Sequence, residues 1–298
     1  MSTKTTSVST GSIFGQKVRD YGLLFKFRLS LTVVFSAAMG FLLAMQGAID
    51  WAGLGMLCLG GFLLSGASNA LNQVLEKDYD KLMQRTANRP VATGRMSVSE
   101  AVLIAGLAST VALIIFAIVF NPLTAFLGSL SLISYAFIYT PMKRVSPAAV
   151  WIGAFPGALP PSIGWVAVTG TFDLVALILF AIQFIWQLPH FWAIGWVAYE
   201  DYLKGGYKLL PSKGGRDKST ALQCLFYSIL LIPVTLLPYW LGMTGWMSAI
   251  GLIVLGLAFA ATNFNLYRKS DKKAALMVMF ASFFYLPLAL LLMVIDKI

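Results

Sequence analysis

A run of polar residues around position 70 has the spacing of one face of a helix. Ser65, Asn69, Asn72, Glu76 and Asp80 are separated by four, three, four and four residues, and residues three or four apart share a helix face. Two carboxylates and an amide supply the oxygen ligands that Mg²⁺ takes in proteins, usually beside water and substrate phosphate. The pattern predicts a Mg²⁺ site whose ligands are Asn72, Glu76 and Asp80. The alternative is a helix end that is merely solvated.

Arginine residues follow these carboxylates directly, at positions 85, 89 and 95. A guanidinium group matches phosphate oxygens with two parallel hydrogen bonds, and a neutral lipid ligand would not require it. Metal ligands followed by phosphate-binding cations predict a site for a Mg²⁺-complexed diphosphate. A basic loop that only orients the chain in a membrane is the simpler alternative.

A second polar stripe contains Gln183, Gln187, His190 and Asp201. Asp201 comes eighteen residues after Gln183, which is five full turns of one continuous helix and therefore the same face. Glu200 precedes it, and a basic segment follows. The order repeats that of the first stripe and predicts an internal duplication that builds one shared site. Asp201 would then be a further metal ligand.

His190 is the only histidine of the chain and lies inside an apolar run. Ionisable residues within a membrane are functional candidates by default. Pro189 lacks a backbone N–H and would leave the carbonyl of Ile185 without its helical partner. We interpret His190 as facing a substrate, and a histidine bonded to a neighbouring helix is the alternative.

The elements that carry these residues follow from composition. The chain has 298 residues, of which 58% are hydrophobic and 11% charged, outside the usual range of soluble domains. Apolar runs of helix length favour an all-α, polytopic membrane bundle of nine transmembrane helices over a β-barrel. The predicted spans are 28–46, 51–75, 98–120, 123–140, 148–169, 173–198, 220–241, 246–266 and 274–295. Residues 1–12 are predicted to form a flexible tail, and 13–298 a single domain.

The charges predict the orientation of this bundle. With nine spans, all of the 22 Lys and Arg residues except Lys297 lie on one side of the membrane. The positive-inside rule places the N-terminus in the cytoplasm and the C-terminus outside, in a multi-pass protein of the cell inner membrane. The net charge of +10 therefore reflects topology, and no nucleic-acid partner is expected.

The fifth predicted span has two interpretations. It is rich in residues that break helices in water: Gly153, Pro156, Gly157, Pro160, Pro161 and Gly164. The glycines would either leave room for a flat ligand beside the backbone or allow close packing of helices.

Four motifs in order resemble one known family over nearly the whole chain. They are Asn72-x3-Glu76-x3-Asp80-x2-Met83-x-Arg85-Thr86-x2-Arg89-Pro90, Tyr139-Thr140-Pro141-x-Lys143-Arg144, Gly157-Ala158-x-Pro160-Pro161-x2-Gly164-Trp165 and Trp186-Gln187-x-Pro189-His190-Phe191. The chain resembles the protohaem IX farnesyltransferases, or haem O synthases, of the intramembrane aromatic prenyltransferase superfamily.

The resemblance implies an activity: transfer of the farnesyl group of farnesyl diphosphate to a vinyl group of protohaem IX (haem b), giving haem O for terminal oxidases, with Mg²⁺ as cofactor. It implies that the Mg²⁺-diphosphate binds Asn72, Glu76 and Asp80. Phosphate contacts would come from Arg85, Arg89, Lys143 and Arg144. Asp201 would belong to a second acidic motif, and His190 would lie near the haem. The expected catalytic residues are Asn72, Glu76, Asp80, Lys143 and His190.

The expected partners are farnesyl diphosphate, protohaem IX, the lipid bilayer, and a downstream haem-modifying enzyme or terminal oxidase. One alternative is a membrane prenyltransferase that acts on a quinone or chlorophyll precursor. The other is a secondary transporter, since duplicated halves and a broken helix also suit that class. Transporters hold their ions near the midplane, whereas these carboxylates are expected at one rim of the membrane.

Overall fold

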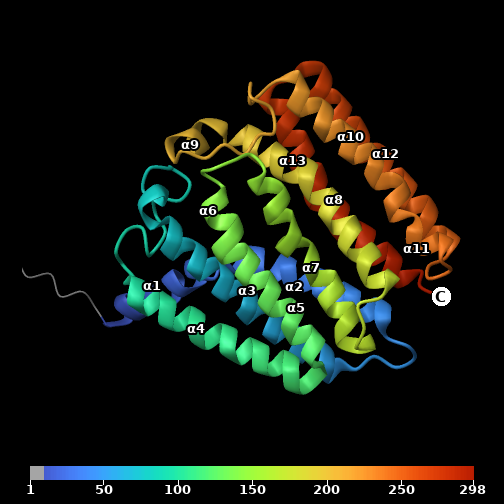
Figure 1. Cartoon of the computed structure of the whole chain (residues 1–298), viewed down its shortest axis with the longest axis horizontal. Coiled ribbons are helices and arrows are strands. Elements are labelled where there is room, and N and C mark those ends of the chain that lie inside the picture. The colour runs from blue at the N-terminus through green and yellow to red at the C-terminus, as the bar shows by residue number, and fades with distance from the viewer. Residues whose placement is uncertain (1–9) are drawn as a thin grey trace, which may run out of the picture.

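The bundle is built from long helices. The structure, a computed structural model, describes residues 10–298 (Figure 1). Its long helices are α2 (Phe27–Ala44), α3 (Trp51–Asp80), α4 (Val98–Ile115), α5 (Pro122–Ile133), α7 (Ala149–Thr169), α8 (Leu174–Val197), α10 (Lys218–Thr235), α12 (Trp246–Lys269) and α13 (Lys272–Ile295). The shorter ones are α1 (Thr10–Leu24), α6 (Thr140–Met142), α9 (Tyr199–Lys204) and α11 (Leu237–Trp240). Two π-helical turns, η1 (Phe116–Phe120) and η2 (Ser134–Tyr139), extend α4 and α5.

The predicted fold class is confirmed over the described residues. Eight helical stretches there are long and apolar enough to cross a membrane. The ninth predicted span is α7, a 21-residue helix with three internal prolines, which lower its hydropathy. It lies in the interior of the bundle and packs against α2 and α8 (Figure 1). Of the predicted tail, residues 1–9 lie outside the described part of the chain, and 10–12 begin α1.

Helix α7 keeps its geometry because neighbouring helices bond the carbonyls that its prolines free. Pro161 has no N–H for the carbonyl of Gly157, and Nε2 of Gln183 donates to that oxygen instead, at 2.7 Å. In the same way Ser131 Oγ donates to the carbonyl of Pro156 at 3.3 Å. These side chains satisfy backbone groups that lipid could not and fix α7 against α5 and α8.

The glycines of α7 allow close packing, as one of the two interpretations held. A Cβ at Gly164 would lie 1.9 Å from the carbonyl oxygen of Ala37, and one at Gly40 would lie 1.9 Å from the backbone of α7. At Gly157 it would lie 2.1 Å from Oε1 of Gln187. The room for a flat ligand stays a prediction, because Gly164 packs on α2 while Gly153 and Gly157 border the cavity described below.

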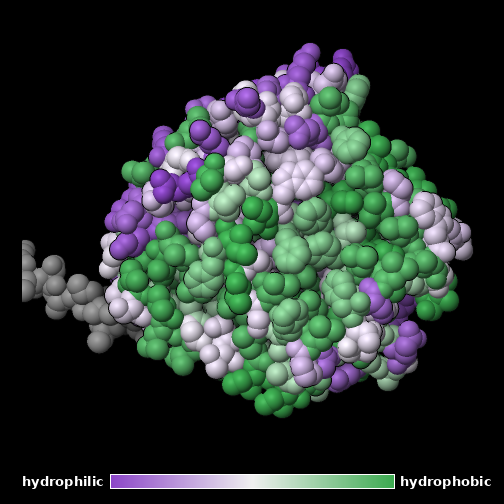
Figure 2. Space-filling view, in the orientation of Figure 1, coloured by the Kyte–Doolittle hydropathy of each residue, from purple (hydrophilic) through white to green (hydrophobic). Residues whose placement is uncertain are grey.

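The surface agrees with a multi-pass membrane protein. Figure 2 shows hydrophobic side chains across the middle of the visible face, and many hydrophilic ones gathered toward the end where α9 lies. Large exposed apolar residues occur on most long helices, for example Leu107 on α4, Phe226 on α10 and Phe284 on α13. Such residues suit contact with lipid tails.

Candidate active site

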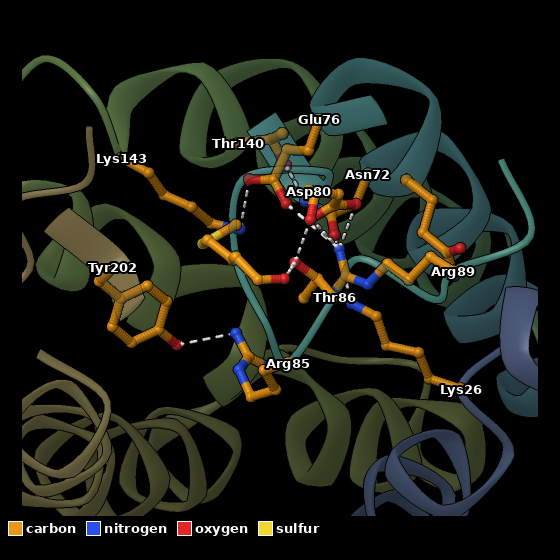
Figure 3. A network of polar contacts seen from close by, with 12 residues as sticks. Lys26, Asn72, Glu76, Asp80, Arg85, Thr86, Arg89, Thr140, Lys143 and Tyr202 are labelled. Atoms are coloured by element: carbon orange, nitrogen blue, oxygen red, sulfur yellow. Dashed lines mark hydrogen bonds and ion pairs between the residues drawn. The ribbon is translucent and has the colours of Figure 1, made fainter. Parts of the chain in front are cut away.

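The first predicted stripe ends in a buried polar cluster on α3. This helix has 30 residues and rises about 45 Å, longer than a hydrocarbon core of about 30 Å. Its last turns therefore extend past the apolar region, where the 81–97 loop covers them. The side chains of Asn72 and Asp80 are fully buried, and Glu76 is 4% exposed (Figure 3).

Two cations neutralise the carboxylates of this cluster. Arg89 binds both oxygens of Asp80, at 2.8 and 2.7 Å, and lies 3.6 Å from Glu76 Oε2. Lys143 Nζ lies 2.8 Å from Glu76 Oε1. The structure thus joins four of the predicted site residues, from α3, the 81–97 loop and the segment after α6, in one network.

Lys26 belongs to the same cluster, although the sequence patterns did not single it out. Its Nζ donates to Asn72 Oδ1 at 3.2 Å, while Asn72 Nδ2 donates to Thr140 Oγ1 at 3.1 Å. Burial lowers the pKa of Lys26 well below its usual range, and the charges of Arg89 and Lys143 lower it further. Lys26 has a left-handed backbone, φ 47°, at the break between α1 and α2. A basic residue before a first span usually signals topology, so its sequence position gave no hint of this contact.

Thr140 reaches Asn72 because a π-helical turn precedes it. In η2 the N–H groups bond carbonyls five residues back rather than four, and Thr140 Oγ1 also donates to the carbonyl of Tyr135 at 2.9 Å. The rings of Tyr135 and Tyr139, with centroids 5.3 Å apart, line a cavity described below. The turn therefore serves both the cluster and the cavity.

Tyrosine rings hold the next predicted phosphate ligands. The guanidinium of Arg144 lies 3.8 Å from the ring centroid of Tyr79 and donates to its hydroxyl. Arg85 lies 5.3 Å from the ring centroid of Tyr202 and donates to its hydroxyl at 3.2 Å. Cation–π contact of this kind fixes a charge without neutralising it. Arg95 instead pairs with an aspartate of α1, away from the cluster.

Asp201 lies apart from the α3 carboxylates. Helix α8 ends at Val197, and Ala198, with φ −98° and ψ 17°, separates it from α9. The expected five continuous turns from Gln183 are therefore wrong. The oxygens of Asp201 accept from the backbone N–H groups of Gln84 at 2.8 Å and Arg85 at 3.2 Å. Its metal-binding role stays a prediction.

The donor set of the cluster fits Mg²⁺ bound together with a diphosphate. Over the described part of the chain, no three His, Cys, Asp or Glu side chains form a group that could hold a metal ion by themselves. The acidic ligands that α3 offers are Glu76 and Asp80. Mg²⁺ commonly takes one or two carboxylates and completes its shell with water and substrate phosphate. Arg89 and Lys143, which now balance these carboxylates, are phosphate-binding residue types.

The two polar stripes meet in one cavity. Its volume is about 970 Å³, and it is bounded mainly by apolar side chains of α2, α3, α7, α8 and α13. Ser65 and Asn69 line it from α3, while Gln183, Gln187 and His190 line it from α8. Asn69 lies one turn from Asn72, so the cavity begins beside the charged cluster. Its size is that of a pocket for a large organic ligand.

His190 is held by α13 and lines this cavity. Its Nδ1 lies 2.7 Å from Ser282 Oγ, and the Ser282 hydroxyl itself donates to the carbonyl of Met279 at 2.6 Å. Ser282 must therefore accept from Nδ1–H, which leaves the lone pair on Nε2. The ring stacks on Trp186 with centroids 4.6 Å apart. His190 thus both contacts a neighbouring helix and lines the cavity, so the two interpretations of this residue do not exclude each other.

Tyr207 is a second residue of the cluster that the sequence patterns missed. It follows α9 in a loop, where spacing carries no information. Its side chain is 3% exposed, and its hydroxyl is buried without a hydrogen-bond partner. Burial raises the pKa of Tyr207, and the negative charge of Glu76 raises it further. The hydroxyl is therefore a protonated donor beside the carboxylates.

Comparison with known proteins agrees with this fold and site. A membrane bundle in which a buried cluster of paired charges lies beside a large apolar cavity suits a ligand with a charged head and a long apolar chain. Residues 33–285 match the UbiA prenyltransferase family, and the chain belongs to that family. It is 48% identical over 279 residues to the "Protoheme IX farnesyltransferase" of Cytophaga hutchinsonii, covering 93% of this chain and 97% of that one. It is 43% identical to the protein of the same name from Christiangramia forsetii, covering 93% of each chain. The resemblance predicted from the four motifs is confirmed.

Solved structures of low identity share the fold. One, described as a digeranylgeranylglyceryl phosphate synthase, has a TM-score of 0.77 at 17% identity and covers 94% of this chain and 98% of its own. Another, a UbiA homologue from Archaeoglobus fulgidus bound to GPP and Mg²⁺, has a TM-score of 0.69 at 14% identity, covering 92% and 99%.

Proposed function

We propose that this protein transfers the farnesyl group of farnesyl diphosphate to a vinyl group of protohaem IX, giving haem O and diphosphate. The observation that carries the proposal is the charged cluster of Glu76, Asp80, Arg89 and Lys143, which follows on α3 from residues that line a 970 Å³ chamber. The names of relatives up to 48% identical support the choice of donor and acceptor.

The cluster binds the diphosphate of the donor. Asn72, Glu76 and Asp80 would hold Mg²⁺, which when bound would supply Lewis-acid stabilisation of charge on the departing diphosphate. Arg89 and Lys143 exchange their carboxylate contacts for phosphate oxygens. Arg85 and Arg144, which tyrosine rings hold, bind the diphosphate from its outer side. Because these charges are fixed before the substrate arrives, they need little reorganisation as the bond breaks.

The chamber holds the apolar chain and the acceptor. When the bond to diphosphate breaks, the allylic carbon becomes electron-deficient, and the faces of Tyr135 and Tyr139 stabilise positive charge beside it. The π electrons of a haem vinyl group then form the new carbon–carbon bond, which leaves the positive charge on the other vinyl carbon. Water adds to that carbon and loses a proton to the released diphosphate, giving the hydroxyethylfarnesyl side chain. The apolar walls exclude bulk water until that stage.

His190 binds the haem in this proposal. Its Nδ1–H is occupied by Ser282 at 2.7 Å, so Nε2 presents a lone pair of the kind that ligates metals. The macrocycle would occupy the 970 Å³ chamber, which Gly153 and Gly157 of α7 also line.

The reaction is tested with purified protein, Mg²⁺, farnesyl diphosphate and either protohaem or 4-hydroxybenzoate. We expect a more hydrophobic haem and one diphosphate for each haem consumed, with the benzoate untouched. Prenylation of the benzoate but not of haem would reject the acceptor and favour the quinone-precursor alternative. Protein in liposomes that moves a solute while releasing no diphosphate would favour the transporter.

We also propose that the N-terminus is cytoplasmic, the C-terminus is outside, and the membrane is the cell inner membrane. The haem product would pass to a haem-modifying enzyme or terminal oxidase. In a background without Cys58 and Cys224, an Ala48→Cys variant, exposed between α2 and α3, should react with a membrane-impermeant maleimide from outside. Lys213→Cys, exposed at the opposite end, should react only after the membrane is opened. The reverse pattern would invert the topology.

A further inference from the structure

Tyr207 is fixed by backbone contacts on both sides. Gly206 has φ +74°, a left-handed conformation that suits glycine. The N–H of Tyr207 donates to the carbonyl of Tyr202 at 2.9 Å, and the N–H of Lys208 donates to the carbonyl of Lys143 at 3.3 Å. The loop after α9 is therefore tied to the segment that carries Lys143, and the phenol ring cannot move far from that lysine.

The ring lies within the charged cluster. Lys143 Nζ is 6.0 Å from its centroid, and the same nitrogen is 2.8 Å from Glu76 Oε1. The Tyr202 ring packs edge-on, with centroids 6.1 Å apart. Native proteins rarely leave a buried hydroxyl without a partner. Yet the hydroxyl of Tyr207, on a side chain 3% exposed, has none.

We propose that Tyr207 is a substrate-binding residue whose hydroxyl donates a hydrogen bond to the diphosphate of the prenyl donor. The inference rests on the proposed function and adds a neutral donor to its charged site. A neutral phenol can donate to a phosphate oxygen, and Lys143 beside it is a phosphate-binding type. A phenol among these cations would add a hydrogen-bond donor to the phosphate site without adding charge.

The experiment compares Tyr207→Phe with Tyr285→Phe in the full-length protein. Tyr285 is a matched control, since it is 2% exposed and its hydroxyl also lacks a partner, but it lies on α13 and does not line the chamber. Binding of inorganic diphosphate is measured calorimetrically at limiting and at saturating Mg²⁺, with thermal unfolding measured in parallel.

We expect Tyr207→Phe to weaken diphosphate binding by about tenfold to a hundredfold, the usual effect of losing a hydrogen bond to a charged group. Tyr285→Phe should leave the affinity unchanged. Neither variant should lower the unfolding temperature substantially, because neither hydroxyl makes a hydrogen bond of normal distance and angle within the described residues. A purely structural role for Tyr207 would instead appear as lower thermal stability.

Equal affinity of Tyr207→Phe and wild type would overturn the inference. So would a loss that disappears at high Mg²⁺, because the hydroxyl would then act by positioning the metal ligand Glu76 rather than by touching diphosphate. If wild-type protein binds neither inorganic diphosphate nor farnesyl diphosphate, the proposed function itself fails, and that result differs from a failure of the Tyr207 variant alone.

Discussion

The end of α3 and the end of α8 both carry carboxylates to the same rim of the bundle, but they present them differently. Helix α3 is continuous to Asp80, and its carboxylates are buried against Arg89 and Lys143. Helix α8 stops at Val197. Beyond it, Glu200, itself exposed, pairs with a half-buried arginine, and Asp201 bonds the backbone of a loop.

The difference shows what continuity of a helix contributes. On a continuous helix, a carboxylate three or four residues from the next polar group stays on the same face as that group. A carboxylate buried there is stable only when a cation pairs with it. After a break, the chain direction changes, and the carboxylate is free to stabilise a loop. We therefore expect substitutions at the α3 end to affect diphosphate chemistry most.

Asp80→Asn should have the largest effect. It removes an anionic ligand of the proposed metal site, and since even outer-shell partners of metals contribute 10–100-fold, we expect at least about a hundredfold loss in diphosphate release. Asp50→Asn is the matched control, because Asp50 caps the other end of α3 through Gly53 N and asparagine also caps helices. Near-normal turnover of Asp80→Asn at low Mg²⁺ would contradict the metal assignment.

His190→Ala should have the next largest effect, and only on one substrate. We expect haem turnover to fall at least about tenfold, because the proposed ligand of the acceptor is lost. Farnesyl diphosphate binding should remain, since the α3 cluster lies elsewhere on the chamber. Equal losses for both substrates, measured by turnover and by calorimetry, would mean that His190 acts through the fold.

Asp201→Asn should have a moderate effect. Asparagine keeps one oxygen for the loop N–H groups but loses the charge that strengthens those bonds, so turnover should fall about twofold to tenfold. The Mg²⁺ concentration for half-maximal activity should not change. An increase in that concentration would show that Asp201 is the metal ligand that the sequence predicts.

Glu200→Gln should have no measurable effect. Glu200 pairs with Arg216 at 3.1 Å, but its side chain is 73% exposed, and exposed ion pairs contribute little. Turnover and unfolding temperature within error of wild type are expected. A clear loss of turnover would place the end of α9 closer to the reaction than the structure does.

Sequence patterns predicted the spans because apolar runs of helix length have one stable state in lipid. They also predicted the face shared by Asn72, Glu76 and Asp80, since a single unbroken helix carries all three. They placed His190 in the bundle, but its bond to Ser282 joins residues 92 positions apart, and no local pattern encodes such a contact.

The missed features all depend on tertiary contacts. No proline or glycine stands at Ala198 to indicate that the helix breaks there. The prediction therefore continued α8 through this residue and placed Asp201 on the wrong face. Lys26 and Tyr207 join the cluster through a left-handed turn at Lys26 and at Gly206, respectively. The side chain of Gln187, from another helix, lies beside Gly157, a contact that the glycine pattern of α7 could not predict.

Because of the π-helical turn η2, the number of residues in its segment matters more to the site than which residues they are. Removing one residue from 134–139 would restore α-helical spacing and rotate everything after it by about 100° while shifting it by about 1.5 Å. Thr140 would then turn away from Asn72, and Lys143 away from Glu76. A relative with a gap within these six positions should therefore hold the residues equivalent to Asn72 and Glu76 by contacts other than those of Thr140 and Lys143. We expect this even if every other site residue matches.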